Sequence, residues 1–239
     1  MIDLHTHILP GMDDGSPDAV TSMQMLRRMA EQGVAVVCAS SHYYADENSV
    51  ATFCTRRQEA LSRWQQAGLG GYDGQPKVLL AAEVAYFPRI SECRDLDRLC
   101  IQGTRTLLLE MPFCEWNDFQ REEVTALALD LGYQLILVHP ERFLFSKNNR
   151  HQLEKLEELP IGLQVNAGSL LRWQTRKQAL GLLTGASCPL LGSDAHNLTA
   201  RPPNLKEGRS VIERKLGAVF WQQMQQNAAR MLGPAFANV

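Results

Sequence analysis

The chain has 239 residues, of which 45% are hydrophobic and 21% are charged, and its formal net charge is −2. This length accommodates a single domain with a substantial core, expected over residues 1–239. The small net charge and the lack of a basic run argue against a nucleic-acid duplex as partner, and no apolar segment approaches the length of a transmembrane span. No signal-peptide pattern and no C-x-x-C pair occur, so we expect a cytoplasmic protein with free thiols.

Apolar, strand-like runs alternate along the chain with segments of helical period, a pattern typical of a parallel sheet in an α/β fold. The expected strands end near His5, Ser40, Glu83, Glu110, His139, Asn166 and Asp194. Helices are expected over residues 17–32, with Ser16 as the N-cap, and over 48–67, 119–131, 148–157 and 212–232. The glycine-rich segment 68–76 is expected to be a surface loop.

Residues that commonly bind metals lie at or close to most of these strand ends. They are His5, His7, His42, Glu83, Glu110, His139, Asp194 and His196. In a barrel of parallel strands the carboxyl ends meet at one face, so these side chains are expected to form one cluster.

Two pairs strengthen this interpretation, because His5 and His7, like Asp194 and His196, are two positions apart. Side chains at that spacing point the same way on an extended backbone, and each pair can therefore bind one metal ion or two adjacent ions. The alternative is a set of hydrogen-bonded core histidines. Eight such residues, all at or near the ends of expected strands, favour a metal site made of imidazole and carboxylate ligands.

Several motifs, in this order, carry a family resemblance. They are Asp3-Leu4-His5-Thr6-His7, Leu9-Pro10-Gly11 with Asp13-Asp14-Gly15, Ser40-Ser41-His42, Ala82-Glu83, Leu109-Glu110-Met111-Pro112-Phe113, His139-Pro140-Glu141-Arg142, Gln164-Val165-Asn166-Ala167-Gly168-Ser169 and Gly192-Ser193-Asp194-Ala195-His196-Asn197. The chain resembles the polymerase and histidinol phosphatase (PHP) superfamily over residues 1 to about 205. Within this superfamily, the chain most resembles the metal-dependent protein-tyrosine phosphatases of bacterial capsule and exopolysaccharide operons. The His-Pro-Glu-Arg tetrapeptide is the motif that separates this branch from other PHP phosphoesterases.

The resemblance implies a distorted (β/α)7 barrel, similar to a TIM barrel, with three divalent metal ions at the carboxyl ends of the strands. By family position, the ligands would be His5, His7 and Asp194 for one ion, Glu83 as a bridge to a second ion with Glu110 and His139, and Asp14, His42 and His196 for a third. Asp13 is the neighbouring alternative to Asp14. Manganese is the metal we expect first, with iron and zinc as alternatives.

The chain departs from the family pattern at two positions. Ser41 replaces a usual proline, and Tyr43 replaces the histidine that commonly follows the ligand equivalent to His42. Tyr43 is therefore expected not to bind metal and to alter the rim of the pocket.

Clustered divalent ions favour phosphate ester hydrolysis, because they acidify a bound water and neutralise the phosphate charge while hydroxide attacks phosphorus. Arg142 follows the strand end at His139, and Arg201 lies just past the loop that carries His196; both are expected to bind phosphate oxygens. The expected substrate is phosphotyrosine on a protein, foremost an autophosphorylated bacterial tyrosine kinase. His151, in a polar helical stretch, is expected to lie outside the site.

Three alternatives were weighed. A cysteine-based phosphatase needs an arginine six residues after its nucleophile, and none of the six cysteines has one. A phosphoesterase for a small metabolite such as histidinol phosphate is the nearest enzyme alternative. A non-catalytic partner of a tyrosine kinase would have lost several ligands, whereas all nine are present. The oligomeric state stays open.

Overall fold

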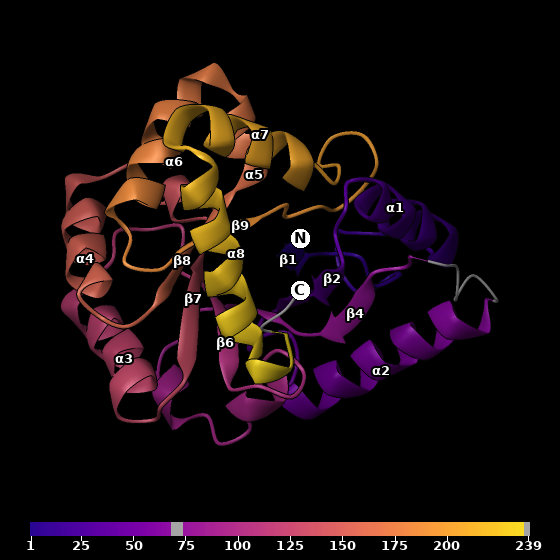
Figure 1. Cartoon of the computed structure of the whole chain (residues 1–239). Helices are drawn as coiled ribbons and strands as arrows, with labels where there is room; N and C mark the ends of the chain where they lie inside the picture. Colours follow the sequence, from indigo (N-terminus) through magenta and orange to yellow (C-terminus); the bar gives the residue numbers. More distant parts are fainter. Residues whose placement is uncertain (68–73, 237–239) are drawn as a thin grey trace.

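The computed structural model describes residues 1–67 and 74–236 (Figure 1). In chain order the strands are β1 (Ile2–Thr6), β2 (Val36–Ala39), β3 (His42–Tyr43), β4 (Lys77–Leu80), β5 (Glu83–Ala85), β6 (Thr106–Glu110), β7 (Gln134–Val138), β8 (Gly162–Asn166) and β9 (Pro189–Gly192). The α-helices are α1 (Ala19–Glu31), α2 (Val50–Gln66), α3 (Asp118–Leu129), α4 (Lys147–Glu157), α5 (Ala167–Leu171), α6 (Trp173–Gly185), α7 (Leu205–Leu216) and α8 (Ala218–Leu232). Short 3-10 turns include Pro140–Arg142.

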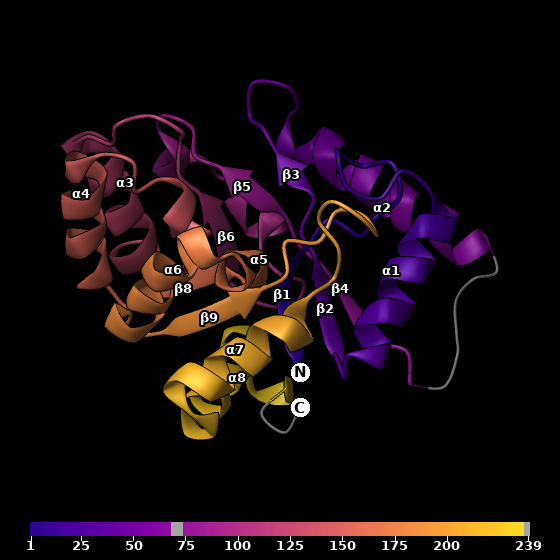
Figure 2. The ribbon, with the colours of Figure 1, turned by 90° about the horizontal axis from the view of Figure 1, so that it is seen from above.

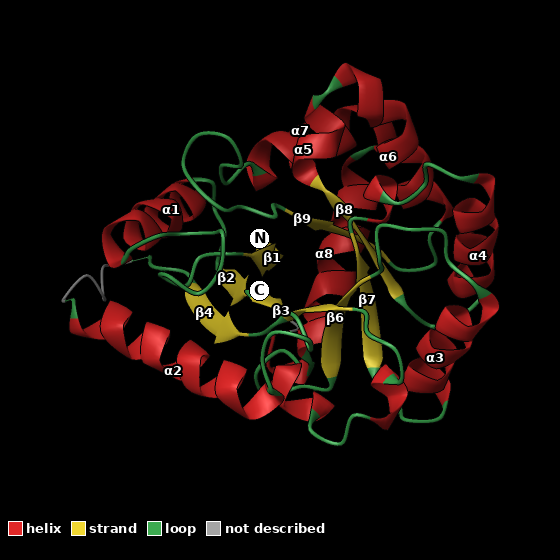
Figure 3. Ribbon diagram, turned by 180° about the vertical axis from the view of Figure 1, so that it is seen from behind, coloured by secondary structure: helices red, strands yellow, loops and turns green. Residues whose placement is uncertain are grey.

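All strand pairs in the described residues are parallel, as the alternation of strands and helices predicts. They form a three-stranded sheet of order β1-β2-β4 and a six-stranded sheet of order β3-β5-β6-β7-β8-β9. Figure 3 shows these strands at the centre with helices around them. The fold is thus α/β with two parallel sheets, and the described strands are not assigned to a single closed sheet.

Two of the seven expected strands are interrupted. The run before His42 divides into β2 and β3, and the run through Glu83 divides into β4 and β5. Hydrogen bonds continue between the two runs at the interruption, from Ala81 N to Ala39 O (2.9 Å) and from Glu83 N to Ser41 O (3.0 Å). A strand was expected to end near Glu83; β4 instead ends at Leu80, and Glu83 begins β5.

The pairing of β1 with β2 is irregular at Leu4 and His5. It runs from Asp3 with Val37 to Thr6 with Ala39, so β1 carries one residue more than β2 between these pairs, as in a β-bulge. Leu4 belongs to an apolar cluster, while His5, the next residue, lies among polar groups. Both residues are fully buried.

Helix α8 contacts the apolar part of the strands. Its residues Ala228, Met231 and Leu232 belong to the same buried cluster as Leu4 and Ile136. Its backbone is tied to the sheet where Thr106 Oγ1 donates to Met231 O at 2.6 Å. Figure 2 shows α7 and α8 side by side next to the N-terminus of β1.

The expected helices are present, with different ends. Asp18, and not Ser16, caps α1 by accepting a hydrogen bond from Thr21 N, because the chain turns into the helix two residues later than expected. The helix expected over 212–232 is two helices, separated at Gly217, whose φ of +93° ends α7. Most of the expected loop over 68–76 lies outside the described residues. Within the described part, no helix is long and apolar enough to cross a membrane.

Candidate metal and phosphate site

The nine expected ligands converge at the carboxyl-terminal side of the strands, and Glu83 lies at their centre. Its Oε2 lies 3.2 Å from His5 Nε2, 3.1 Å from His7 Nε2 and 2.9 Å from His42 Nδ1. Its Oε1 lies 2.6 Å from His139 Nε2. Four imidazoles, from three separate parts of the chain, therefore surround one fully buried carboxylate.

The second nitrogen of two of these imidazoles is already engaged. His5 Nδ1 donates to Gln164 Oε1 at 2.7 Å, and His7 Nδ1 donates to Asp13 Oδ2 at 2.7 Å. The free Nε2 atoms of His5 and His7 then face each other at 3.2 Å. Two such lone pairs repel unless a proton or a cation lies between them.

Asp13 and Asp14 have different environments. Asp13 is bound to His7 and to the backbone N of His42 at 2.9 Å, and it also accepts from Gly15 N. Asp14 is exposed and lies 3.6 Å from His42 Nε2 and 3.3 Å from His196 Nε2. Gly15 is required here, because a Cβ would come within 2.3 Å of His7 O.

His139 and Asp194 both adopt a left-handed backbone, with φ of 36° and 52°. This conformation is unfavourable for residues other than glycine and is tolerated where the surroundings impose it. It directs His139 toward Glu83 and, at 3.6 Å, toward Glu110. It also allows Asp194, two residues beyond β9, to reach the cluster.

The two carboxylate oxygens of Asp194 have separate roles. Oδ2 accepts from Arg201 Nη2 at 2.6 Å and from Asn166 Nδ2 at 2.7 Å. Oδ1 is buried without a hydrogen bond and lies 3.5 Å from the Nε2 atoms of both His5 and His7. The carboxylate is therefore oriented by one oxygen while the other faces the histidines.

The two expected arginines lie beside Asp194. Arg201 is held by a turn in which its carbonyl accepts from His196 N at 2.9 Å. Arg142 follows His139 in the Pro140–Arg142 turn, and its Nη1 is 3.8 Å from Asp194 Oδ2. Both side chains are about one-third exposed, which leaves donors free to meet a ligand.

Sequence reasoning did not anticipate the role of Gln164. Its Oε1 accepts from His5, and its Nε2 donates to Asn166 Oδ1 at 2.9 Å. Asn166, expected only as a wall or turn residue, in turn donates to Asp194. The available signal was their spacing of two along β8, which directs both amides to the side where the ligands gather.

Electrostatics within the cluster is dominated by burial and by opposite charges. Burial disfavours the charged imidazole of His7, but Asp13 and Glu83 overcome this and raise its pKa to about 10. Burial, together with the charge of Glu83, raises the pKa of Glu110 to about 7. Burial and repulsion by His7 lower the pKa of His196 to about 3. Protons and any bound cation therefore compete for the same buried positions.

Residues expected outside the site are outside it. His151 lies on α4 with its side chain 62% exposed. Tyr43 binds none of the cluster and instead packs against the rings of Phe53 and Phe87, with centroids 5.4 and 6.4 Å away. Because Tyr43 is buried in the core, the expectation that it shapes the pocket rim is wrong.

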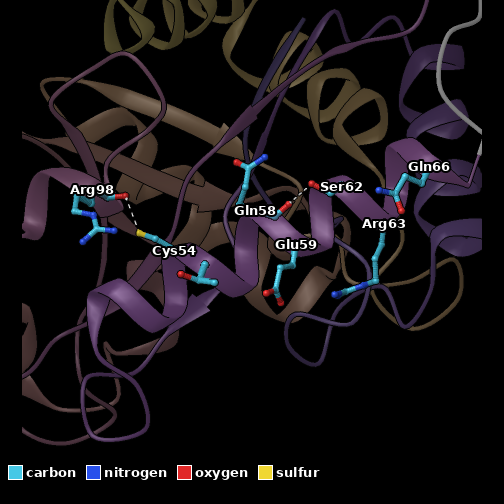
Figure 4. A pocket seen from close by; sticks show the side chains of 8 residues that line it. Cys54, Gln58, Glu59, Ser62, Arg63, Gln66 and Arg98 are labelled. Carbon is cyan, nitrogen blue, oxygen red and sulfur yellow. Dashed lines mark hydrogen bonds between the residues drawn. The ribbon is translucent and has the colours of Figure 1, made fainter.

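A cavity of about 570 Å³ opens beside the cluster. The residues lining it include Glu141, Arg142, Asn166, Asp194 and Arg201. Its volume is in the range of small-molecule sites. A second hollow of similar volume lies on the outer surface of α2 and is lined by Cys54, Gln58, Glu59, Ser62, Arg63, Gln66 and Arg98, together with Thr55 (Figure 4). None of the expected ligands lines this second hollow.

The cysteines of the described chain are all free. Burial raises the pKa of the Cys38 thiol, and it raises that of Cys100 to about 12. Such thiols are poor nucleophiles near neutral pH. This agrees with the lack of a cysteine-phosphatase spacing in the sequence.

Comparison with known proteins gives consistent matches over nearly the whole chain. The chain is 28% identical to the tyrosine-protein phosphatase YwqE of Bacillus subtilis, over 97% of this chain and 91% of that protein. It is 25% identical to the tyrosine-protein phosphatase CpsB of Streptococcus agalactiae, over 91% of each.

A solved structure also matches. It comes from work on YwqE from Bacillus subtilis and CpsB from Streptococcus pneumoniae, described as unique metal-dependent tyrosine phosphatases, and it superimposes with a TM-score of 0.81 at 26% identity, covering 97% of this chain and 94% of that one. The family model for capsular polysaccharide synthesis, CpsB/CapC, matches residues 1–233. The chain therefore belongs to the CpsB/CapC family.

Proposed function

We propose that this protein is a metal-dependent protein-tyrosine phosphatase whose substrates are phosphotyrosine proteins of capsule or exopolysaccharide synthesis, foremost an autophosphorylated tyrosine kinase. The names of its relatives support the substrate class. The chemistry is supported by a single observation of this chain, namely the approach of His5 Nε2 and His7 Nε2 to each other and to Glu83 Oε2 while both Nδ1 atoms are engaged. That arrangement suits a cation, because it supplies aligned lone pairs and a carboxylate in a buried site.

The donor set fits several divalent ions. Three groups of side chains have ligand atoms within 4.8 Å of one another; they are His7, Asp14, His42 and His196, then His5, His7 and Glu83, then His42, Glu83 and Glu110. We propose three ions, held by the nine expected residues His5, His7, Asp14, His42, Glu83, Glu110, His139, Asp194 and His196. Mixed imidazole and carboxylate ligands suit manganese, iron or zinc, with manganese as our first choice.

Asp14, and not Asp13, is the proposed ligand of the third site. Asp13 has both oxygens engaged by His7, His42 and Gly15, so its role is to orient His7. The exposed carboxylate of Asp14 lies between His42 and His196 and has room to meet an ion.

The arginines would bind the phosphoryl oxygens. Arg201 and Arg142 lie beside Asp194 at the cavity, where planar guanidinium groups can form paired contacts with phosphate. Bound divalent ions would supply an acidified water and neutralise the phosphate charge. The chain itself orients part of this set, since His5, His7 and Asp194 are each held by hydrogen bonds to neighbouring side chains.

We also propose that residues 1–239 form one domain and that the two sheets make up a distorted seven-stranded barrel of the PHP type. Asp194 N donates to His5 O at 2.9 Å and His7 N donates to Ala195 O at 2.8 Å, which links the end of β9 to β1. With the continuity of β2 with β3 and of β4 with β5, these bonds support a ring of strands.

The proposal is tested by comparing hydrolysis of a phosphotyrosine peptide with that of histidinol phosphate. We expect a higher kcat/KM for the peptide, loss of activity on chelation, and no loss after thiol alkylation. A preference for histidinol phosphate would support the small-molecule phosphoesterase instead. Inactivation by alkylation but not by chelation would contradict metal-dependent chemistry.

A further inference from the structure

Phe113 is an exposed aromatic residue directly beside Arg142. It follows β6 three residues after Glu110 and is 58% exposed. Its ring packs against Phe143 with centroids 4.7 Å apart, and Phe143 is 1% exposed. Phe113 is thus supported by the core, while much of its surface is available for contact.

Arg142 links Phe113 to the candidate phosphate position. The guanidinium carbon of Arg142 lies 5.2 Å from the ring centroid of Phe113, a cation–π distance. The same guanidinium is 3.8 Å from Asp194 and carries a charge that acts on Glu110. A phosphate bound by Arg142 would therefore have the Phe113 ring within reach of the group esterified to it.

We propose that Phe113 is a specificity residue that contacts the aromatic ring of the substrate and so favours aryl over alkyl phosphate esters. This inference rests on the proposed phosphatase function. Aromatic pairs favour offset or edge-to-face contact at centroid distances of about 4.5–7 Å, which is compatible with a ring that keeps an exposed surface. An alkyl phosphate would have the same phosphoryl contacts and would lack this one.

Tyr44 also lies close to the cluster, but one face of its ring is covered. It stacks on His42 at a centroid distance of 5.4 Å and an interplanar angle of 25°. Phe119, on α3, is 53% exposed. Phe119 is therefore a matched control of the same type and similar exposure.

The experiment compares Phe113→Leu, Phe113→Tyr and Phe119→Leu with the unaltered protein at full metal content. Phosphotyrosine and p-nitrophenyl phosphate serve as aryl esters, and phosphoserine serves as the alkyl ester. For Phe113→Leu we expect kcat/KM to fall on the order of tenfold for the aryl esters, mainly through KM, and to stay within about twofold for phosphoserine. Phe113→Tyr keeps an aromatic ring and should retain the preference for aryl esters. Phe119→Leu should leave this preference unchanged.

An equal fall for aryl and alkyl esters would overturn the proposal, because it would mean that Phe113 acts only by holding Arg142 against the shared phosphate. Unchanged kcat/KM for both kinds of ester in Phe113→Leu would overturn it as well. Both outcomes leave the proposed function intact if the unaltered protein hydrolyses phosphotyrosine. Failure of the unaltered, metal-loaded protein on phosphotyrosine would instead contradict the proposed function itself.

Discussion

The two ends of the same strands are equally buried but chemically opposite. Toward α8, Ile136 and Leu190 are fully buried within an apolar cluster. At the other end, where the candidate ligands gather, Glu83 and His139 are also fully buried, among other ionisable groups. Burial stabilises the first end, whereas at the second end it penalises every charge that is not paired. The same degree of burial therefore stabilises the folded protein at the apolar end and destabilises it at the polar end. The polar end carries this cost because its side chains are needed for the chemistry.

The separation of these ends depends on small backbone irregularities. The register of β1 shifts between Asp3 and Thr6, where Leu4 and His5 lie, and the left-handed backbone at His139 and Asp194 turns those residues toward the cluster. Each feature changes the direction in which side chains point near the end of a strand. Substitutions at the polar end should therefore affect mainly activity, and substitutions at the apolar end should affect mainly the free energy of unfolding.

The largest functional effect is expected at the centre of the polar end. Glu83→Ala removes the carboxylate that four histidines surround, and we expect metal content to fall and kcat/KM to drop by about 1,000-fold or more. His151→Ala, on the exposed surface of α4, is the control and should behave like the unaltered protein. Equal effects of the two substitutions would show that the ligand assignment is incorrect.

At the apolar end, the expected effect is on stability. Ile136→Ala leaves a cavity beside Leu190 and Met231, and we expect the free energy of unfolding to decrease by about 2–5 kcal/mol. Denaturant unfolding measures this, while kcat/KM at a temperature where the variant is folded should stay within about twofold. A large loss of activity without a loss of stability would contradict the separation of the two ends.

Within the polar end, substitutions of the arginines should weaken substrate binding without reducing metal binding. Arg142→Ala and Arg201→Ala are each expected to retain full metal content and to lose about 2–4 kcal/mol of transition-state stabilisation, or on the order of 30- to 1,000-fold in kcat/KM. Arg142→Lys should restore only part of this, since an ammonium lacks the planar pair of donors. Unchanged kinetics in both alanine variants would remove these arginines from the site.

A smaller effect is expected for the amide that orients His5. Gln164→Leu removes the acceptor for His5 Nδ1, and we expect metal affinity to weaken by about 10- to 100-fold. Gln134→Leu, at the opposite end of the neighbouring strand, is the matched control and should bind metal normally. Metal-binding titrations measure both. Similar affinities in the two variants would mean that Gln164 does not position the ligand.

The sequence predicted the cluster better than the strands that form it. Parallel strands bring their carboxyl ends together whatever the details, so spacing and residue type were sufficient to group eight of the candidates, and the family resemblance added Asp14. The order of elements followed from the alternation of apolar runs and helical segments. The CpsB/CapC match confirms the family resemblance on which the assignment of individual residues depended.

The irregular features could not be predicted because tertiary contacts produce them. The breaks between β2 and β3 and between β4 and β5 occur within runs that are apolar or small throughout. Nothing local in Leu4 or His5 indicates a bulge. Gln164 was missed because an amide has no ligand signature of its own, and its role depends on reaching His5 across the fold.

The central claim is that these residues hold the ions required for phosphotyrosine hydrolysis, and a manganese titration of the metal-free protein tests it most directly. Bound metal and phosphotyrosine-peptide turnover would be measured together at pH 6 and pH 8. Because the pKa of His7 is raised to about 10 without metal, its proton must leave on loading, so apparent affinity should increase by about tenfold per pH unit in this range for each displaced proton. We predict that activity appears only as about three ions bind, with tighter binding at pH 8. Full turnover in the presence of chelator, with no bound metal, would contradict the claim.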